Sequence, residues 1–159
     1  STRNTPYYLA ILGAGALFGF FFTMSVSIMP GFDMTDPYAA LITNQNIGRA
    51  TQKSLFFVAL LGTPLVLVFA TVMSWKAVVS RNWLLLALAT YLVMMGVTVL
   101  LNVPLNQQLD GLVITPTMDN AADHWQAYSV PWQQWNWLRV LFSGASLLFV
   151  SFALRNVSR

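Results

Sequence analysis

The stretch WLLLALATYLVMMGVTVLLNV, Trp83–Val103, is a run of 21 residues without a charged side chain. About 20 apolar residues in an α-helix are enough to cross the hydrocarbon core of a bilayer. The run therefore predicts a membrane-spanning helix. It continues into NVPLNQQLD, Asn102–Asp110, where two asparagines stand four positions apart on either side of Pro104. Amide side chains at the end of a span need hydrogen-bond partners, so their neighbours in the fold are the main question that the sequence raises.

Three further segments have the same apolar character: Tyr8–Met29, Leu55–Trp75 and about Trp135–Leu154. Of the 159 residues in the chain, 57% are hydrophobic and only 8% are charged, whereas soluble domains carry about 25% charged residues. The mean hydropathy is +0.62. We therefore predict an all-α fold, an integral membrane four-helix bundle that forms a single transmembrane domain over residues 1–159.

Charged side chains divide into two groups along the chain. The two terminal segments and the loop between the second and third spans carry only basic residues: Arg3, Lys76, Arg81, Arg155 and Arg159. The loops after the first and third spans are longer and contain all five acids: Asp33, Asp36, Asp110, Asp119 and Asp123. Because basic loops stay in the cytoplasm, we predict cytoplasmic termini in a bacterial inner membrane. Arg49 and Lys53 are the exceptions, since they lie in an outer loop.

Several classes of function are excluded by what the chain lacks. It has no cysteine, no glutamate and a single histidine, His124. Disulfides, thiolate metal sites and iron–sulfur clusters therefore drop out, as do the Glu and His sets of di-iron bundles and three-histidine zinc sites. We predict no metal site and no cofactor. The net charge of +3 does not indicate nucleic-acid binding, because the basic residues are scattered at the ends of the spans.

Polar side chains recur at helical spacing in two spans, which marks the face that each helix turns toward the bundle interior. In the third span the stripe is Tyr91, Met95, Thr98, Asn102 and Asn106, and in the fourth it is Trp132, Trp135, Asn136, Arg139, Ser143 and Ser146. Contact between helices is the commonest role of such residues.

The first two spans contain glycine and proline residues that affect the helix backbone and its packing. Gly15 and Gly19 have the GxxxG spacing, which predicts that another helix approaches closely at that point. Pro64 stands inside the second span, where it removes one helical hydrogen bond and leaves the carbonyl of Leu60 free. We expect a kink there.

Arg139 is the most unusual residue of the fourth span, because a guanidinium keeps its charge and costs about 2.5–3.5 kcal/mol at the middle of a membrane helix. Two interpretations are open. Its side chain could extend to the outer interface, since Arg139 lies only four residues after Trp135. We favour the other interpretation, in which Arg139 caps a polar cavity at the outer end. There it would donate to Asn102, Asn106 or Asp110 and to an anionic ligand oxygen.

Aromatic residues gather at the start of the fourth span in WQQWNW, Trp132–Trp137. Indole rings collect at membrane interfaces without any functional need, but aromatic walls beside polar groups also suit a planar aromatic ligand. His124 precedes them in DNAADHW. It is either a solvated loop residue or a general base, the role to which histidine is best suited near neutral pH.

Four stretches in this order resemble a known family: GFFFTMSVSIMPGFD (Gly19–Asp33), QNIGRATQ with Asn46, NVPLNQQLD, and WQQWNWLR (Trp132–Arg139). Over nearly the whole chain they are similar to the anthrone oxygenase-like family of small membrane proteins, with NVPLN and W-x-x-W-N-x-x-R as the most specific parts. Pro30, Asn46, Asn102, Pro104, Asn106, Trp135, Asn136 and Arg139 fall on the family's pattern. Family members with an assigned activity oxygenate anthrones, which are reduced tricyclic aromatic polyketides, to anthraquinones with molecular oxygen and no known metal or flavin.

The resemblance implies a cofactor-independent membrane oxygenase that acts on a lipophilic anthrone-like phenol or quinol. In this hypothesis the donors of Asn102, Asn106 and Arg139 would stabilise the enolate that forms on deprotonation. The ligand would contact Trp132, Trp135, Asn136, Tyr91 and Thr98, with His124 as the candidate base.

One departure from the family bears on this hypothesis. Many relatives have histidine directly after the Trp-Asn pair, where this chain has Trp137. Either His124 takes over as the base, or the anthrone chemistry is absent. The alternative function is a non-catalytic bundle that binds a lipid or a quinone-like molecule, or that serves as a subunit of a membrane complex. A homo-oligomer is compatible with both functions.

Overall fold

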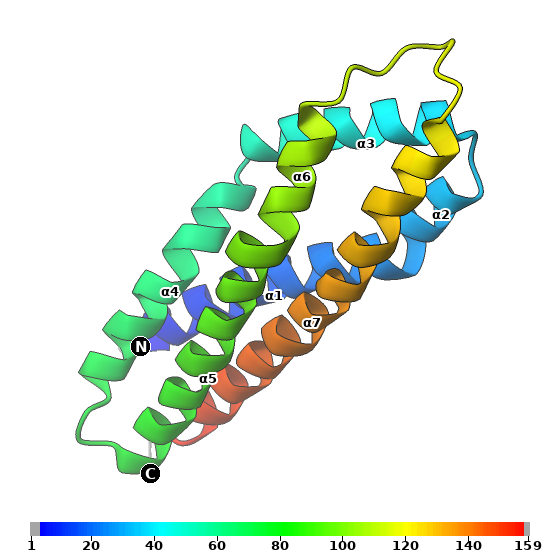
Figure 1. Ribbon diagram of the computed structural model, residues 1–159. Helices are drawn as coiled ribbons and strands as arrows, with labels where there is room; N and C mark the ends of the chain where they lie inside the picture. The colour runs from blue at the N-terminus through cyan, green and yellow to red at the C-terminus, as the bar shows by residue number, and fades with distance from the viewer. Residues whose placement is uncertain (1–3, 158–159) are drawn as a thin grey trace.

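The computed structural model describes residues 4–157, and every regular element in that range is helical. In chain order the elements are α1 (Thr5–Thr23), η2 (Met24–Ile28), α2 (Met29–Asp33), α3 (Pro37–Gln52), α4 (Phe56–Met73), α5 (Val78–Val97), η3 (Thr98–Asn102), α6 (Val103–Asp110) and α7 (Ala121–Arg155), as Figure 1 shows. The predicted all-α class is confirmed. Arg3 and Arg159, which entered the prediction of topology, lie outside the described residues.

Four helical stretches are long and apolar enough to cross a membrane: Thr5–Asp33, Phe56–Met73, Val78–Asp110 and Ala121–Arg155. The predicted integral membrane four-helix bundle is therefore confirmed. The last stretch begins well before Trp135, because α7 continues without a break through Pro131 toward its N-terminus. This extension carries the aromatic residues Trp125, Tyr128 and Trp132 to one end of the bundle.

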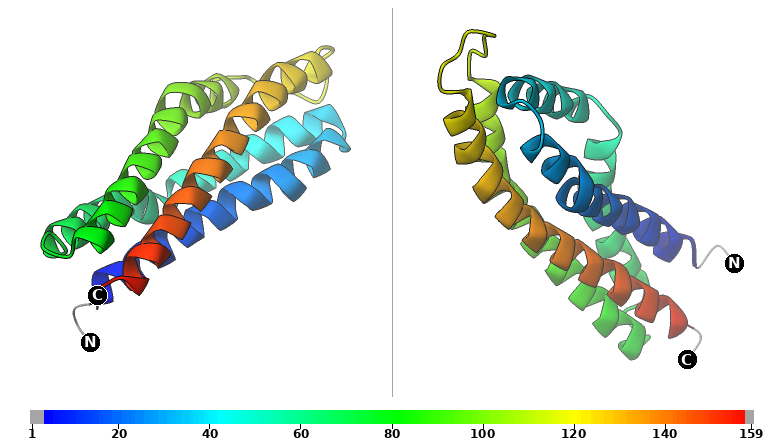
Figure 2. Two further views of the ribbon diagram at one scale, coloured as in Figure 1. Left: turned by 90° about the horizontal axis from the view of Figure 1, so that it is seen from below. Right: turned by 90° about the vertical axis from the view of Figure 1, so that its right-hand side faces the viewer.

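The two ends of the bundle are formed by different elements. The start of α1 and the end of α7 lie at one end, beside the connection between α4 and α5 (Figure 1). At the opposite end, α3 lies across the other helices, as Figure 2 shows. We name this opposite end the outer end, after the side of the membrane that the charge pattern predicts for it. Asp36 caps the N-terminus of α3, because its carboxylate accepts a hydrogen bond from the backbone N–H of Ala39 at 3.1 Å. Pro37 is the first residue of the helix.

Two of the long stretches contain a wider, π-helical turn just before a proline. In η2 the N–H of Met29 donates to the carbonyl of Met24, and in η3 the N–H of Val103 donates to the carbonyl of Thr98. Pro30 and Pro104 stand one residue further on. A π-helical turn adds a residue to the helix and so changes the direction of the side chains that follow. Asn102, the last residue of η3, is fully buried in the interior.

Close approach between helices occurs at glycines other than the predicted pair. A Cβ atom on Gly13 would lie 2.0 Å from Oγ1 of Thr63 on α4, whereas a Cβ atom on Gly19 would meet nothing within 4 Å and one on Gly15 only a leucine methyl group at 3.8 Å. The predicted close approach at Gly15 and Gly19 is therefore wrong. The GxxxG spacing is present, but the face of α1 that packs on α4 is the one that carries Gly13.

A buried polar cluster joins the helices at the end that holds the termini. The hydroxyl of Tyr7 hydrogen-bonds to Oγ of Ser74 and, at 2.8 Å, to Oγ of Ser80. Ser80 in turn donates to the carbonyl of Ala153 at 3.0 Å. Because these residues belong to α1, the α4–α5 connection, α5 and α7, the cluster fixes all four long helices relative to one another.

Candidate functional site

A cavity of about 640 Å³ lies at the outer end of the bundle, between η2, α3, α4, the η3–α6 segment and α7. This volume is within the range of roughly 300–1,000 Å³ that is common for small-molecule sites. Apolar side chains line it together with polar ones, among which are Asn44, Gln45, Arg49, Thr98, Asn106, Asp110, Tyr128 and Arg139. Ligand sites combine apolar walls with polar groups that fix the orientation of the ligand.

Arg139 lies at the cavity with only 4% of its surface exposed. Its guanidinium carbon is 4.4 Å from the ring centre of Phe21 and 4.9 Å from that of Trp132. Within residues 4–157, Nε and Nη2 have no hydrogen-bond partner. The structure thus contradicts the interpretation in which Arg139 extends to the interface. It also shows no hydrogen bond from these two nitrogens to Asn102, Asn106 or Asp110.

Asn106 is held by two donors from α7. Its Oδ1 accepts hydrogen bonds from Nε1 of Trp132 at 2.8 Å and from the hydroxyl of Tyr128 at 3.0 Å. These bonds fix the amide orientation, and within the described chain Nδ2 of Asn106 has no hydrogen-bond partner. Asn106 lines the cavity together with Tyr128 and Trp132. Its N–H groups are therefore available to a ligand oxygen.

Asn102 and Asn136 bind the backbone of neighbouring helices and do not line the cavity. Nδ2 of Asn102 donates to the carbonyl of Trp132 at 3.2 Å. Nδ2 of Asn136 donates to the carbonyl of Phe21 at 2.8 Å and to Oγ of Ser25 at 2.6 Å. Both residues are fully buried, and the Oδ1 atom of each has no partner in the range 4–157. These two amides connect the π-helical ends of the first and third spans to α7.

The remaining predicted site residues divide between the cavity and other places. Thr98 and Trp132 line the cavity. Tyr91 is buried in the core, and its hydroxyl donates to the carbonyl of Leu60 at 2.7 Å. Trp135 and His124 are partly buried and do not belong to the cavity lining. Trp137, at which the sequence departs from the resemblance, is 47% exposed.

The rim of the cavity at the outer end is formed by α3 and α6. Nε of Arg49 forms an ion pair with Oδ1 of Asp110 at 2.7 Å, and both side chains are about half exposed. Next to this pair, Nε2 of Gln45 donates to the carbonyls of Leu109, Asp110 and Leu112 at 2.9, 3.3 and 3.2 Å. Gln45 therefore closes the C-terminal end of α6, where helical carbonyls lack partners.

Asn44, Gln45 and Tyr128 were not predicted as site residues. Asn44 and Gln45 could have been predicted from the amphipathic character of α3, which buries Ala40, Leu41, Asn44 and Gln45. Tyr128 stands four residues before Trp132 and continues its stripe toward the N-terminus of α7.

Asp33 forms a second polar centre at the outer end. Its Oδ1 accepts from Nε1 of Trp125 and from Oγ of Ser129, both at 2.8 Å, and its Oδ2 accepts from Nε2 of Gln133 at 2.9 Å. Three donors on α7 thus hold the end of α2. Both oxygens of the carboxylate accept hydrogen bonds from α7, which indicates a structural role.

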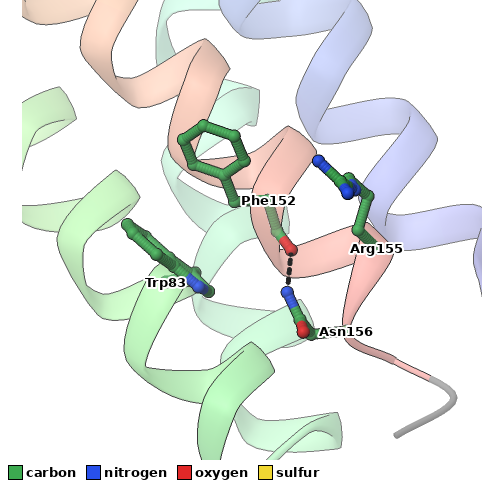
Figure 3. A pocket seen from close by; sticks show the side chains of 4 residues that line it. All are labelled: Trp83, Phe152, Arg155 and Asn156. Atoms are coloured by element: carbon green, nitrogen blue, oxygen red, sulfur yellow. Dashed lines mark hydrogen bonds between the residues drawn. The ribbon is translucent and has the colours of Figure 1, made fainter.

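A smaller pocket of about 290 Å³ lies at the end that holds the termini, lined by Trp83, Phe152, Arg155 and Asn156 (Figure 3). Nδ2 of Asn156 donates to the carbonyl of Phe152 at 2.8 Å. Arg155 is exposed, and no member of this group is a buried polar residue without a partner. Over residues 4–157 there is also no group of three or more His, Asp or Glu side chains placed to hold a metal ion.

A family model described as anthrone oxygenase matches residues 45–149, about two thirds of the chain. The matched region includes the second half of α3, all of α4 to α6 and most of α7. It therefore contains Asn106, Asp110, Tyr128, Trp132 and Arg139. No curated protein and no solved structure matches the chain.

Proposed function

This chain belongs to the anthrone oxygenase family, and we propose that it oxygenates a lipophilic phenol or quinol of the anthrone type in the cavity at the outer end. The observation that supports this proposal most is that the guanidinium of Arg139 is buried beside the cavity without a full set of hydrogen-bond partners. Only 4% of the surface of Arg139 is exposed, the residue borders a cavity of about 640 Å³, and two nitrogens of its guanidinium have no partner in the described chain.

A buried cation without an anion is unfavourable, because removing an ion from water costs several kcal/mol even after the protein has relaxed. The rings of Phe21 and Trp132 compensate part of this loss through cation–π contact. They leave the edge of the guanidinium without acceptors. An oxygen that carries negative charge would satisfy Nε and Nη2, and an enolate oxygen has that charge only after the substrate loses a proton.

Asn106 would provide the second donor. Trp132 and Tyr128 hold its Oδ1, so the amide does not have to reorganise when a ligand oxygen arrives. Donors that are oriented in advance toward developing charge are the largest single source of catalysis in many enzymes. The arrangement can therefore favour deprotonation of a bound phenol or anthrone.

In the proposed reaction, a ring CH₂ group of the substrate becomes a carbonyl group. The substrate first loses one proton, and the resulting enolate reacts with molecular oxygen to form a carbon–oxygen bond. Cleavage of the oxygen–oxygen bond then leaves one oxygen atom on the ring carbon. The other oxygen atom leaves as water with both hydrogens of the former CH₂ group, so that one O₂ is used for each product.

Asp110 is the proposed proton acceptor. Among the described residues that line the cavity it is the only carboxylate, and no histidine belongs to the lining. Trp137 faces away from the cavity, and His124 lies outside the lining. The proposal therefore replaces His124 with Asp110 as the candidate base.

A non-catalytic bundle is the second candidate function. It is favoured by Asn102 and Asn136, because both amides donate to backbone carbonyls of neighbouring helices. In this case the cavity would hold a lipid or quinone-like molecule without changing it.

The test uses the protein in lipid nanodiscs with anthrone as substrate, an oxygen electrode and the absorbance of the quinone. We expect one O₂ consumed for each anthraquinone formed. Arg139→Gln should lower the rate about 100-fold or more, as removal of one donor at a developing oxyanion does in other enzymes. Arg155→Gln, at the opposite end, is the matched control and should retain the rate. Binding of anthrone without oxygen uptake above empty nanodiscs would favour the non-catalytic bundle.

A further inference from the structure

The cavity has a second rim that differs from the polar rim at α3 and α6. The polar rim contains Arg49, Gln52, Gln107 and Asp110. The second rim contains Phe57 and Leu61 on α4 and Val99 on η3, and it is entirely apolar. Phe57, Leu61 and Val99 are 40%, 54% and 56% exposed. Because they both line the cavity and reach the outside of the bundle, the cavity opens between α4 and η3.

Local structure on both sides accounts for this opening. Helix α4 begins only at Phe56, directly after the turn that follows α3, and it packs mainly on α1 and α5. The third span leaves the regular α-helix at Thr98, where η3 and then Pro104 change its direction. The two elements can be followed in Figure 1 as α4 and the segment that continues from α5 into α6.

The opening lies within the apolar part of the fold. Leu61 and Val99 both belong to stretches that are apolar enough to cross a membrane, and the 18-residue apolar window in each stretch has a mean hydropathy of 2.4. No charged residue belongs to this rim. An opening at this level faces hydrocarbon, since the spanning part of a bundle is surrounded by lipid tails.

We propose that the opening between α4 and η3 is a lateral portal through which an uncharged, planar polycyclic phenol or quinol enters directly from the bilayer. This inference rests on the proposed function for the identity of the ligand. The apolar rim admits the rings, and the buried Arg139 then meets the ligand oxygen. A charged or strongly hydrated ligand would lose its water at this rim without any compensating hydrogen bond, so the portal selects for molecules that dissolve in the membrane.

The absence of cysteine in the chain allows a direct test. Thr98→Cys places one thiol at a buried position of the cavity lining. The probes are pyrene maleimide, a planar polycyclic reagent that partitions into lipid, and a sulfonated maleimide that stays in water. We expect pyrene maleimide to label the thiol in nanodiscs at least ten times faster than the sulfonated reagent.

The portal is then narrowed by Leu61→Trp together with Val99→Trp in the same Thr98→Cys protein. Labelling by pyrene maleimide should slow at least tenfold. Leu65→Trp is the matched control, because Leu65 is 70% exposed on the same helix and does not line the cavity; it should leave the rate unchanged. If the double variant fails to purify as a folded protein, Leu61→Trp alone is compared with Leu65→Trp.

Three outcomes would overturn the portal. These are no labelling by pyrene maleimide, equal labelling with the open and narrowed rims, and slower labelling when Gln107→Trp obstructs the polar rim instead. The labelling needs no turnover, so it separates the two proposals. If oxygen uptake is absent but labelling is normal, the oxygenase proposal is wrong and the portal proposal stands. If oxygen uptake is normal but the reagent enters through the polar rim, only the portal proposal is wrong.

Discussion

The hydroxyl of Tyr91 donates to the carbonyl oxygen of Leu60 across a distance of 2.7 Å. Pro64 stands four residues after Leu60 and has no N–H to offer to that carbonyl. Tyr91 on α5 therefore supplies the hydrogen bond that the proline removes from α4. This relationship gives Tyr91 a structural role in the core, and its side chain does not line the cavity.

We expect Tyr91→Phe to lower the free energy of unfolding by about 1–3 kcal/mol, because the buried carbonyl of Leu60 loses its donor. The same change should cost less in a Pro64→Ala background, where residue 64 regains an N–H. Thermal unfolding of the four proteins measures this difference. Equal costs of Tyr91→Phe in both backgrounds would show that the two residues are not coupled in this way.

Asp33 should be important for stability but not for ligand binding. Its carboxylate accepts from Trp125, Ser129 and Gln133, and Asp33→Asn would place an N–H group against at least one of these donors. We expect a loss of about 1–3 kcal/mol in unfolding free energy. Asp119→Asn, at an exposed loop position, is the control. A loss no larger than that of the control would contradict the structural role.

The contact between α1 and α4 predicts a contrast between two glycines of α1. Gly13→Ala would place Cβ 2.0 Å from Oγ1 and 3.1 Å from Cβ of Thr63, so we expect overpacking to cost about 1–3 kcal/mol. Gly19→Ala meets nothing within 4 Å and should be nearly neutral or slightly stabilising, since alanine favours the helix. Thr63→Ala should rescue Gly13→Ala. Comparable melting temperatures for the two glycine variants would disprove the close approach.

At the polar rim, Gln45 should contribute more to stability than the ion pair between Arg49 and Asp110. The ion pair between Arg49 and Asp110 is half exposed, and such pairs are worth about 0–1 kcal/mol. Gln45 is buried and donates to three backbone carbonyls. We therefore expect Gln45→Ala to destabilise the protein more than Arg49→Ala does. Chemical unfolding in detergent micelles provides the comparison, and the reverse order would contradict this assignment.

Much of the fold could be predicted because apolar length and helical spacing are local properties of the sequence. The four spans follow from hydropathy, and the inward stripe explains why Thr98, Asn102 and Arg139 are buried. The partners of those residues depend on how the helices pack, which spacing alone does not determine. Asn102 and Asn136 were expected at a ligand, yet both donate to carbonyls of neighbouring helices.

The part of the site contributed by α3 could not be predicted from the spans. Helix α3 is too polar to cross the membrane, and only its position across the outer end brings Asn44 and Gln45 to the cavity. The departure at Trp137 also changes its meaning in the structure. Trp137 is 47% exposed and does not line the cavity, so the side chain at this position does not contact the candidate site.

The central claim is that the free nitrogens of Arg139 bind the oxygen of a planar phenol inside the outer cavity. The most direct test is a structure of the protein in lipid nanodiscs with bound 1,8-dihydroxyanthraquinone, a stable product-like phenol. We expect the ligand between Trp132 and the α4–η3 opening, with an oxygen at hydrogen-bond distance, about 2.7–3.2 Å, from Nε or Nη2 of Arg139. A ligand bound elsewhere, or an Arg139 that contacts only Phe21 and Trp132 when the cavity is filled, would contradict it.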